Sequence, residues 1–374
     1  MTPRQRLFHA LRGEPVDQMP VWLLFPYAPT GYYVDVRAHP EYRQVCDFAD
    51  AHGVIVLNRR GLRAPLHTAA VTSHEQELGS GDARVRRRTL RCGAINICEE
   101  HPFAPGLPGK KLLASDEDLE AYCQLPLEQD EAVIHAALEM QLATYRREQA
   151  EFPLDCGAMM LSLGSPVNYL YHSANLEEYA IWSLTHNDLV VAWLDRVMRQ
   201  MEILYRFCLE RDLADVYFLV GSELASPPLV SRATFQKWVV PYESRLIALI
   251  RSYGKLAIQH YHGQIREILP DFLTMQPDGL HTVEAPPVGN CTLTQAFERT
   301  QEGITLIGNI QYDEFRSSTP EEMRRRVREV LDEVAGRRFI LSPSAGPFDP
   351  TPPARLFENY RAFIEAAGEY GKGH

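Results

Sequence analysis

The stretch that decides the fold is Ala257-Ile258-Gln259-His260-Tyr261-His262-Gly263, where a short apolar run ends in polar residues before the chain turns. Residues two apart on a β-strand point to the same face, so His260 and His262 are expected to project together. The same pattern recurs at Gly221-Ser222-Glu223 and at Val283-Glu284-Ala285. Two imidazoles and two carboxylates at the ends of neighbouring strands are ligand types that suit zinc. The pattern predicts a metal-dependent enzyme.

Short β-rich runs alternate with helix-like segments along the whole chain. The eight candidate strands are Met19–Leu24, Gly53–Leu57, Cys156–Leu163, Val216–Val220, Leu256–His260, Gly279–Val283, Ile304–Ile307 and Arg338–Leu341. Several are continuously apolar, as strands buried on both faces are. Between them lie apolar stripes at helical spacing, as from Leu189 to Cys208, and helix starts such as Thr319-Pro320. Eightfold alternation predicts an α/β fold, a (β/α)8 TIM barrel. A doubly wound sheet is the alternative, but no GxGxxG motif follows any strand.

One region departs from this alternation. Residues 65 to 115 contain a predicted hairpin, Arg84–Thr89 with Ala94–Glu99, and a Pro/Gly-rich stretch at 102–109. We interpret this region as an insertion after the second strand that covers the mouth of the barrel. No internal repeat or low-complexity tract divides the chain, so residues 1–374 are expected to form one domain.

Composition excludes several classes of protein. The chain has 374 residues, of which 45% are hydrophobic and 23% charged, as in soluble globular proteins. A net charge of −11 argues against nucleic acid as a partner. No apolar run approaches the roughly 18 residues of a membrane-spanning helix, and no signal-peptide pattern follows Met1. The seven cysteines are scattered without a CxxC pair, which indicates reduced thiols and a cytoplasmic location.

Polar residues follow five successive candidate strands at the end where barrel enzymes have their active sites. The candidate catalytic residues are Glu223, His260, Tyr261 and Glu284, and the candidate metal ligands are Glu223, His260 and His262. The candidate substrate contacts are Trp22, Tyr27, Asn58, Asn309, Gln311 and Ser344. Each assignment has a structural alternative. The histidines could be hydrogen-bonded loop residues, Glu223 a helix cap and Glu284 an ion-pair partner. His281, in mid-strand, is interpreted as a core or surface histidine.

A longer series of motifs resembles the uroporphyrinogen decarboxylase superfamily, which includes the cobalamin-dependent methyltransferases. The matching segments are the opening Thr2-Pro3-Arg4 with Leu11–Trp22, Ser231–Phe235, His260–Gly263, Gly308-Asn309-Ile310, Thr319–Glu322 and Glu358-Asn359-Tyr360. The resemblance covers nearly the whole chain. It implies a (β/α)8 barrel and a homodimer.

Within this superfamily the chain is more similar to the methyltransferases than to true uroporphyrinogen decarboxylases. The decarboxylases have an arginine-rich segment directly after the first strand, whereas residues 23–30 here contain no arginine. They have an aspartate after the second strand, where this chain has Asn58, and a C-terminal histidine that residues 342–347 lack. A tetrapyrrole with many carboxylates needs compensating cations, so this chain is a poor host for it.

The resemblance also has implications for the metal. Coenzyme M methyltransferases of the superfamily hold zinc by a His-x-Cys pair after the fifth strand and by a later cysteine. In this chain His262 occupies the position of the cysteine in the His-x-Cys pair, and residues 342–346, where the later cysteine would lie, contain none. A harder nitrogen and oxygen site remains, with Glu284 as a further candidate ligand, and it suits zinc acting as a Lewis acid.

The expected reaction is transfer of a methyl group from a small donor, such as a methoxyl compound, to the cobalt of a separate corrinoid protein. Two alternatives stay open. One is a metal-free decarboxylase or lyase that acts on a small carboxylic acid. The other is a metal-binding relative that has lost catalysis.

Overall fold

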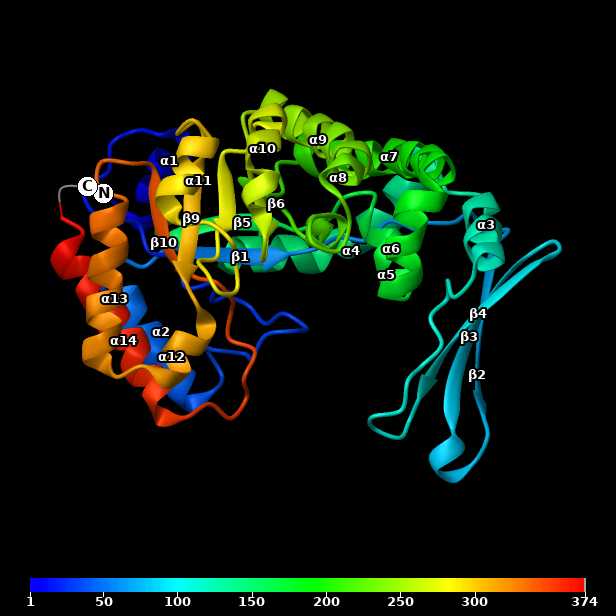
Figure 1. Cartoon of the computed structure of the whole chain (residues 1–374), viewed down its shortest axis with the longest axis horizontal. Coiled ribbons are helices and arrows are strands. Elements are labelled where there is room, and N and C mark those ends of the chain that lie inside the picture. The colour runs from blue at the N-terminus through cyan, green and yellow to red at the C-terminus, as the bar shows by residue number, and fades with distance from the viewer. Residues whose placement is uncertain (373–374) are drawn as a thin grey trace.

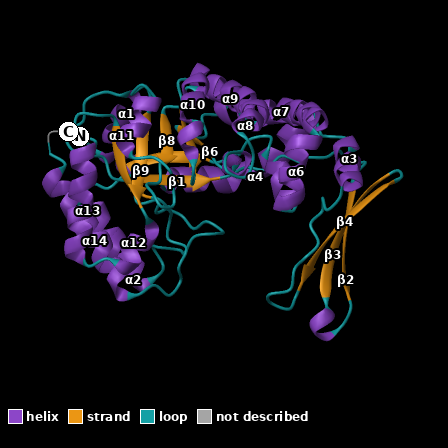
Figure 2. Ribbon diagram, viewed as in Figure 1, coloured by secondary structure: helices purple, strands orange, loops and turns teal. Residues whose placement is uncertain are grey.

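The computed structural model describes residues 1–372, and its centre is a curled parallel β-sheet with helices outside it (Figures 1 and 2). Seven strands follow in the order β1-β5-β6-β7-β8-β9-β10. Their bounds are Val56–Arg60 (β1), Gly157–Leu161 (β5), Val216–Leu219 (β6), Leu256–Tyr261 (β7), Gly279–Thr282 (β8), Thr305–Ile310 (β9) and Phe339–Pro343 (β10). All neighbouring pairs are parallel, and β7 and β8 are in a register that places His260 opposite His281.

Residues 20–22 link the two edges of this sheet. Val21 forms an isolated bridge with Leu341 of β10, and Trp22 forms one with Ile55, just before β1. The first predicted strand is therefore reduced to a pair of bridges. Pro20 has no N–H to donate, and Leu24 has a positive φ of 58° that ends the extended backbone. Seven strands and this linking segment correspond to the eight strands predicted from the sequence.

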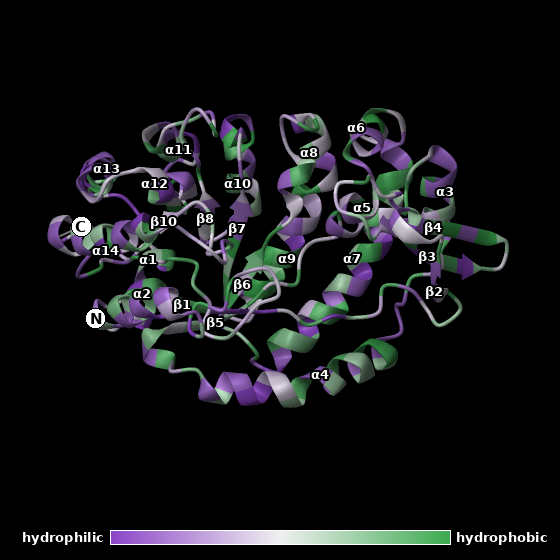
Figure 3. Ribbon diagram, turned by 90° about the horizontal axis from the view of Figure 1, so that it is seen from below, coloured by the Kyte–Doolittle hydropathy of each residue, from purple (hydrophilic) through white to green (hydrophobic). Residues whose placement is uncertain are grey.

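Helices surround the sheet. Their bounds are Pro3–Arg12 (α1), Pro40–Ala51 (α2), Asp116–Gln124 (α3), Glu131–Glu151 (α4), Asn168–Ser173 (α5), Leu176–Thr185 (α6), Asn187–Glu210 (α7), Arg232–Trp238 (α8), Val240–Ser252 (α9), Leu269–Met275 (α10), Leu293–Arg299 (α11), Tyr312–Ser317 (α12), Pro320–Glu333 (α13) and Ala354–Tyr370 (α14). Four 3₁₀ turns are Gly81–Ala83 (η1), Leu154–Cys156 (η2), Ser222–Ala225 (η3) and Ile265–Glu267 (η4). The helices carry both polar and apolar turns in Figure 3, as expected when one side faces the sheet. Among the described helices, none combines the length and apolarity needed to cross a bilayer.

Alternate residues of each strand belong to two different apolar clusters. Ile55, Leu57, Phe218 and Ile258 form an inner cluster enclosed by the curled sheet. Their neighbours Val56, Tyr217, Leu219 and Ala257 join the larger core under the helices. This division follows from the period of two in a β-strand, and it determines which polar residues can face the interior of the curled sheet.

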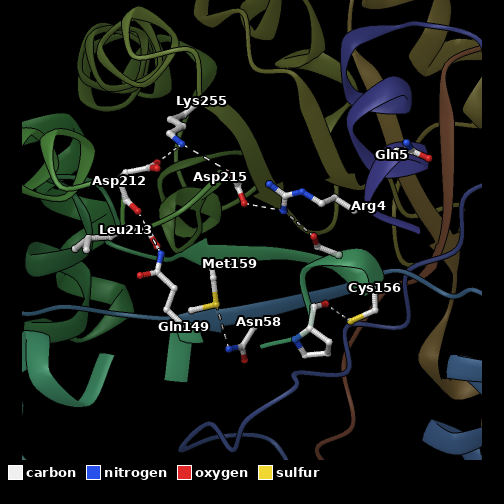
Figure 4. A network of polar contacts seen from close by, with 12 residues as sticks. Arg4, Gln5, Asn58, Gln149, Cys156, Met159, Asp212, Leu213, Asp215 and Lys255 are labelled. Atoms are coloured by element: carbon white, nitrogen blue, oxygen red, sulfur yellow. Dashed lines mark hydrogen bonds and ion pairs between the residues drawn. The ribbon is translucent and has the colours of Figure 1, made fainter. Parts of the chain in front are cut away.

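Helix α1 closes the amino end of the sheet. Leu7 and Leu11 belong to the inner cluster. Nη1 of Arg4 donates to the carbonyl of Gly157, at the start of β5, and pairs with Asp215, just before β6, each at 2.9 Å (Figure 4). The carboxyl ends of the strands, where the candidate site residues lie, are at the opposite end.

Residues 72–102 form a separate antiparallel sheet of three strands, Thr72–Leu78 (β2), Val85–Cys92 (β3) and Ile95–Pro102 (β4). The sequence pattern indicated the β3–β4 hairpin but not β2, because the residues of β2 are polar and mostly exposed on both faces. In Figures 1 and 3 this sheet projects away from the curled sheet, with β4 against α3. The prediction that the insertion covers the mouth of the barrel is therefore wrong.

The approach of β1 to Gly157 generates a stability prediction. A Cβ atom at Gly157 would overlap the backbone carbonyl of Val56. We expect Gly157→Ala to lower the free energy of unfolding by about 1–3 kcal/mol, as overpacking does. Gly368→Ala is the control, because a methyl group added at Gly368 of α14 would meet no atom within 4 Å, and it should stabilise by up to about 1 kcal/mol. Urea denaturation of both variants measures this, and equal effects would contradict the predicted overlap.

Candidate active site

Three histidine rings meet at the carboxyl ends of β7 and β8. The ring centroids of His260 and His262 lie 4.5 Å apart with planes at 87°, so the two side chains of the HxH motif are adjacent. The ring of His281 stacks on that of His260 with centroids 4.8 Å apart. His281 is fully buried, which agrees with its interpretation as a core histidine, but it also contacts the candidate site directly.

Hydrogen bonds indicate which ring nitrogens of this group carry protons. Nε2 of His281 lies 3.1 Å from the carbonyl of Pro343, which can only accept, so Nε2 carries a proton. Burial lowers the pKa of His281 to about 3, so the ring is neutral and its Nδ1 accepts from Nδ1 of His260 at 2.7 Å. Burial, together with the neighbouring His281 and His262, also holds the pKa of His260 far below its usual value. His260 is therefore neutral and keeps a lone pair on Nε2.

His262 is held by a carboxylate. Its Nδ1 lies 3.2 Å from Oε1 of Glu284, and the N–H of Gly263 donates to Oε2 at 2.7 Å. Burial opposes a charge on His262, but the hydrogen bond and charge of Glu284 outweigh it and raise the pKa of His262. The same hydrogen bond lowers the pKa of Glu284 against the effect of burial. With Nδ1 bound to Glu284, Nε2 of His262 is the nitrogen left for a ligand.

Glu223 lies on η3, directly after β6. Its Oε2 accepts the N–H of Gly221 at 2.7 Å. Burial raises the pKa of Glu223, and His262 is close enough for its charge to act in the opposite direction. Glu223 thus lies within electrostatic range of His262.

Tyr261 points to the other face of β7. Its hydroxyl donates to Oε2 of Glu243 at 3.2 Å, and its ring packs against Phe235 and Phe272 under the helices. The structure therefore does not bring Tyr261 to the histidines, because the residue between His260 and His262 must face outward.

Glu243 of α9 is a buried carboxyl group that sequence reasoning missed. It is fully buried and accepts hydrogen bonds from Ser222, Gln259 and Tyr261, which all adjoin candidate site residues. Burial raises its pKa despite these hydrogen bonds. A single glutamate in an amphipathic helix gives no sequence signal of burial, so only the three-dimensional contacts identify it.

Two predicted substrate contacts lie away from the histidines. Asn58 accepts the N–H of Ala28 at 3.1 Å, and its Nδ2 is directed toward the sulfur of Met159 on the outer face of the sheet (Figure 4). Tyr27 packs against Phe152. The alternation Ile55, Leu57, Arg59 places the next residue, Arg59, on the inner face instead, and this period of two could have identified it.

The other predicted contacts lie at or beside the site. The ring of Trp22 is 5.5 Å from that of His281. Gln311 is near enough to Glu284 to contribute to lowering its pKa, and it accepts a hydrogen bond from the hydroxyl of Ser344 at 3.2 Å. Asn309 is 2% exposed, and its Oδ1 has no hydrogen-bond partner within residues 1–372. These side chains are available to orient a ligand.

A pocket of about 700 Å³ opens at the carboxyl ends of β1, β5 and β6. Its lining includes Arg59, Arg63 and Val220, and Val220 precedes the Gly221 that binds Glu223. Ser165, also in the lining, is hydrogen-bonded to Ser222 at 2.6 Å. The pocket therefore opens beside residues 220–222, which precede Glu223, and its lining includes neither Glu223 nor the histidines of the HxH motif.

The donor set fits zinc by its chemistry. His260 and His262 each have Nδ1 bound to a neighbour and Nε2 free of one, as metal-binding histidines usually do. Glu223 adds a carboxylate nearby. Within the part of the chain that the structure describes, however, no three His, Cys, Asp or Glu side chains are grouped closely enough to form a metal site as they stand.

Comparison with known proteins gives the family. Residues 136–370, more than half of the chain, match the uroporphyrinogen decarboxylase (URO-D) family model. The chain belongs to the uroporphyrinogen decarboxylase family. This agrees with the resemblance noted from its motifs.

Two relatives and one solved structure similar to this chain are named as methyltransferases. Methylcobamide:CoM methyltransferase MtbA of Methanosarcina acetivorans is 22% identical over 383 residues, covering 99% of this chain and 98% of the relative. MtbA of Methanosarcina mazei is 23% identical with the same coverage. A solved structure of a methyltransferase from Methanosarcina mazei has a TM-score of 0.61 at 20% identity over 99% of both chains, which supports the fold. The chain is thus similar to the methyltransferase branch of the superfamily.

The raised pKa of Glu243 predicts a pH dependence of stability. In the unfolded chain this carboxyl ionises at lower pH than in the folded protein, so its contribution to stability falls as pH rises from about 4.5 through the folded pKa. Glu243→Gln removes the ionisable group and with it this pH-dependent contribution to stability. The stability of the wild type relative to Glu243→Gln should therefore decrease with pH, by about 1.4 kcal/mol for each unit by which the pKa is raised.

Urea denaturation of both proteins between pH 4.5 and 8 measures this decrease. Glu120→Gln, an exposed residue of α3, controls for the loss of one negative charge. A difference between wild type and Glu243→Gln that stays constant with pH would contradict the prediction.

Proposed function

We propose that this protein is a zinc-dependent methyltransferase that moves a methyl group between a small molecule and the corrinoid of a partner protein. The observation that carries the proposal is the pair of Nε2 atoms of His260 and His262, which have no hydrogen-bond partner among the described residues and whose rings are oriented by His281 and Glu284. The similarity to two methylcobamide:CoM methyltransferases supports the class of reaction.

The direction of transfer is part of the proposal. In the names of the relatives, methylcobamide comes first and CoM second. For this chain we propose transfer from a small methoxyl-type donor to the corrinoid. Two imidazoles and a carboxylate, without a cysteine, form a harder ligand set that suits an oxygen or nitrogen atom better than a thiolate.

The residues have separate roles in this reaction. Zinc bound by His260, His262 and Glu223 would act as a Lewis acid on the heteroatom that carries the methyl group. A reduced corrinoid would supply the electron pair of the new cobalt–carbon bond, and the heteroatom would keep the pair of the broken bond and take a proton. Glu284 fixes the proton of His262 on Nδ1. Asn309 and Gln311 hydrogen-bond the small molecule, and Trp22 forms an apolar wall beside it.

Glu223 has two alternative roles. As a carboxylate it is the third metal ligand. Because burial raises its pKa, it is also the better of the two glutamates to give a proton to the departing heteroatom. Tyr261, the other group considered for proton donation, is bound to Glu243 on the far face of the strand.

Other parts of the proposal concern the whole protein. We place the corrinoid on a separate protein by the resemblance to the cobalamin-dependent methyltransferases. A single domain and a homodimer are proposed from the family resemblance. All seven cysteines are unpaired, which supports a reducing, cytoplasmic compartment.

A second candidate function is metal-free decarboxylation of a small carboxylic acid. It is favoured by the arginines in the pocket that opens beside residues 220–222, because they could bind a carboxylate. In that case the histidines would act as acid and base groups.

Metal content and methyl transfer test the main proposal. Elemental mass spectrometry should find about one zinc per chain in the wild type and none in the His260→Ala/His262→Ala double variant. Methyl transfer from methoxyl donors to a reduced corrinoid should fall by about 1,000-fold or more in the double variant. Glu223→Gln separates its two roles: loss of zinc identifies a ligand, and loss of turnover with zinc retained identifies a proton donor.

Each result has a clear meaning. A metal-free wild type that still decarboxylates small acids would favour the second candidate. Zinc binding without any turnover would favour a relative that has lost catalysis.

The positions of Glu284 and Tyr261 give a matched pair of variants. Glu284→Gln should weaken zinc binding by about 10- to 100-fold, because it removes the carboxylate that orients His262. Tyr261→Phe should leave zinc affinity and turnover within about twofold of the wild type, since its hydroxyl faces α9. Competition with a chelator measures both affinities. A larger loss in Tyr261→Phe than in Glu284→Gln would contradict the assignment.

A further inference from the structure

Arg59 has no carboxylate partner. The one hydrogen bond that its side chain makes among residues 1–372 is from Nη2 to the hydroxyl of Ser162 at 3.1 Å. Its Nε is buried without a partner, and no acidic side chain of the described residues forms an ion pair with it. A guanidinium has five N–H donors and is always charged, so most of the donors of Arg59 are left for something else.

Two aromatic rings fix the orientation of this guanidinium. The carbon at its centre lies 4.9 Å from the ring centroid of Tyr32 and 4.9 Å from that of Phe218. Rings that interact with a guanidinium occupy its faces and leave its edges available for hydrogen bonds in the plane. The unused donors of Arg59 are thus held in a defined direction, which is what recognition of a planar or tetrahedral anion requires.

The pocket that contains Arg59 is positively charged. Its lining includes Arg59, Arg60 and Arg63, and it contains no aspartate or glutamate. Arg60 is neutralised by Glu148, whereas Arg63 is in none of the ion pairs of the described chain. Thr30 also lines this pocket, and its buried hydroxyl has no hydrogen-bond partner within residues 1–372. In a protein with a net charge of −11, this local excess of cations calls for an anionic ligand.

Arg59 is also close to the histidines. The ring of Phe218 that contacts Arg59 lies 5.3 Å from the ring of His260. The charge of Arg59 contributes to lowering the pKa of His260 and opposes the effect of burial on the pKa of Glu223. The ring of Phe218 therefore lies next to both the guanidinium of Arg59 and the ring of His260.

We propose that Arg59 binds the oxyanion of the small substrate, so that this substrate is a carboxylate or sulfonate whose other end lies at His260, His262 and Glu223. The inference rests on the proposed function, because it takes the reacting end of the molecule to lie at those three residues. Thr30 and Arg63 supply further donors at the anionic end of the pocket. Neutral methyl ethers are then expected to be poor methyl donors for this protein.

Three compounds with the same methyl ether and different ends test the proposal: methoxyacetate, 2-methoxyethanesulfonate and neutral 2-methoxyethanol. Calorimetric titration of the purified protein at low ionic strength measures their binding. We expect at least one of the two anions to bind the wild type about 10- to 100-fold more tightly than the alcohol. Whichever of the two anions binds more tightly identifies the carboxylate or the sulfonate as the preferred group.

Variants assign this preference to one side chain. Arg59→Met should abolish the preference for the anion and leave binding of the alcohol unchanged. Arg59→Lys keeps the positive charge but lacks the planar guanidinium, so it should retain part of the preference for the anion. Arg43→Met, on the exposed side of α2, is the control and should behave as the wild type. Melting temperatures of all the variants distinguish loss of the site from loss of the fold, and Arg59→Lys covers the case in which Arg59→Met does not fold.

Transfer assays with a reduced corrinoid separate this inference from the proposed function. Loss of anion preference in Arg59→Met together with a raised KM for an anionic donor supports both. Anion binding through Arg59 with no methyl transfer from any donor would overturn the proposed function and leave the anion site. Methyl transfer with equal binding of the three compounds, or with no effect of Arg59→Met, would overturn the role of Arg59. If Arg59→Met raises only the concentration of corrinoid protein that methyl transfer requires, the role of Arg59 in substrate binding is also overturned. Arg59 would then bind the partner protein.

Discussion

The period of two in a buried β-strand is the constraint on which the rest of this molecule depends. Both faces of the curled sheet are buried, so each strand residue lies either in the inner cluster or under the helices. On and directly after β7, the side chains of His260 and His262 therefore face the interior of the sheet. The side chain of Tyr261, between them, faces the helices and binds Glu243. A shift of one residue would exchange an imidazole for a phenol and would separate the site from its partners.

The sequence was sufficient where the signal is local and repeated. Strand–helix alternation, the HxH motif and the capping residue Thr319 depend on nearest neighbours, and each corresponds to an observed element. The family motifs led to the family that the comparison shows. Signals that depend on tertiary contacts were not available. Nothing local marks Glu243 as buried, and strand β2 is polar on both faces.

Asn58 and Arg59 show that an assignment from sequence can miss the inward-facing residue by a single position. The resemblance directed attention to Asn58, because the family has an acidic residue after the second strand. In the structure Asn58 binds Ala28 and Met159 on the outer face, while Arg59 faces inward between two aromatic rings. Charge follows the same division: the inner face has the neutral rings of His260 and His281 and the guanidinium of Arg59, whereas Glu243 is enclosed on the outer face.

Helix α1 has a consequence for the order of events in any reaction at this site. Arg4 ties the helix to the starts of β5 and β6, and Leu7 and Leu11 fill the interior behind the histidines. In the proposed function, a ligand would therefore approach the histidines from the carboxyl ends of the strands. The small molecule and the partner protein of the proposed reaction would then approach from the same side, and the small molecule would have to be seated before the partner docks. The remainder of the small molecule would leave after the partner has moved away, so the proposed reaction would have a fixed order of binding and release.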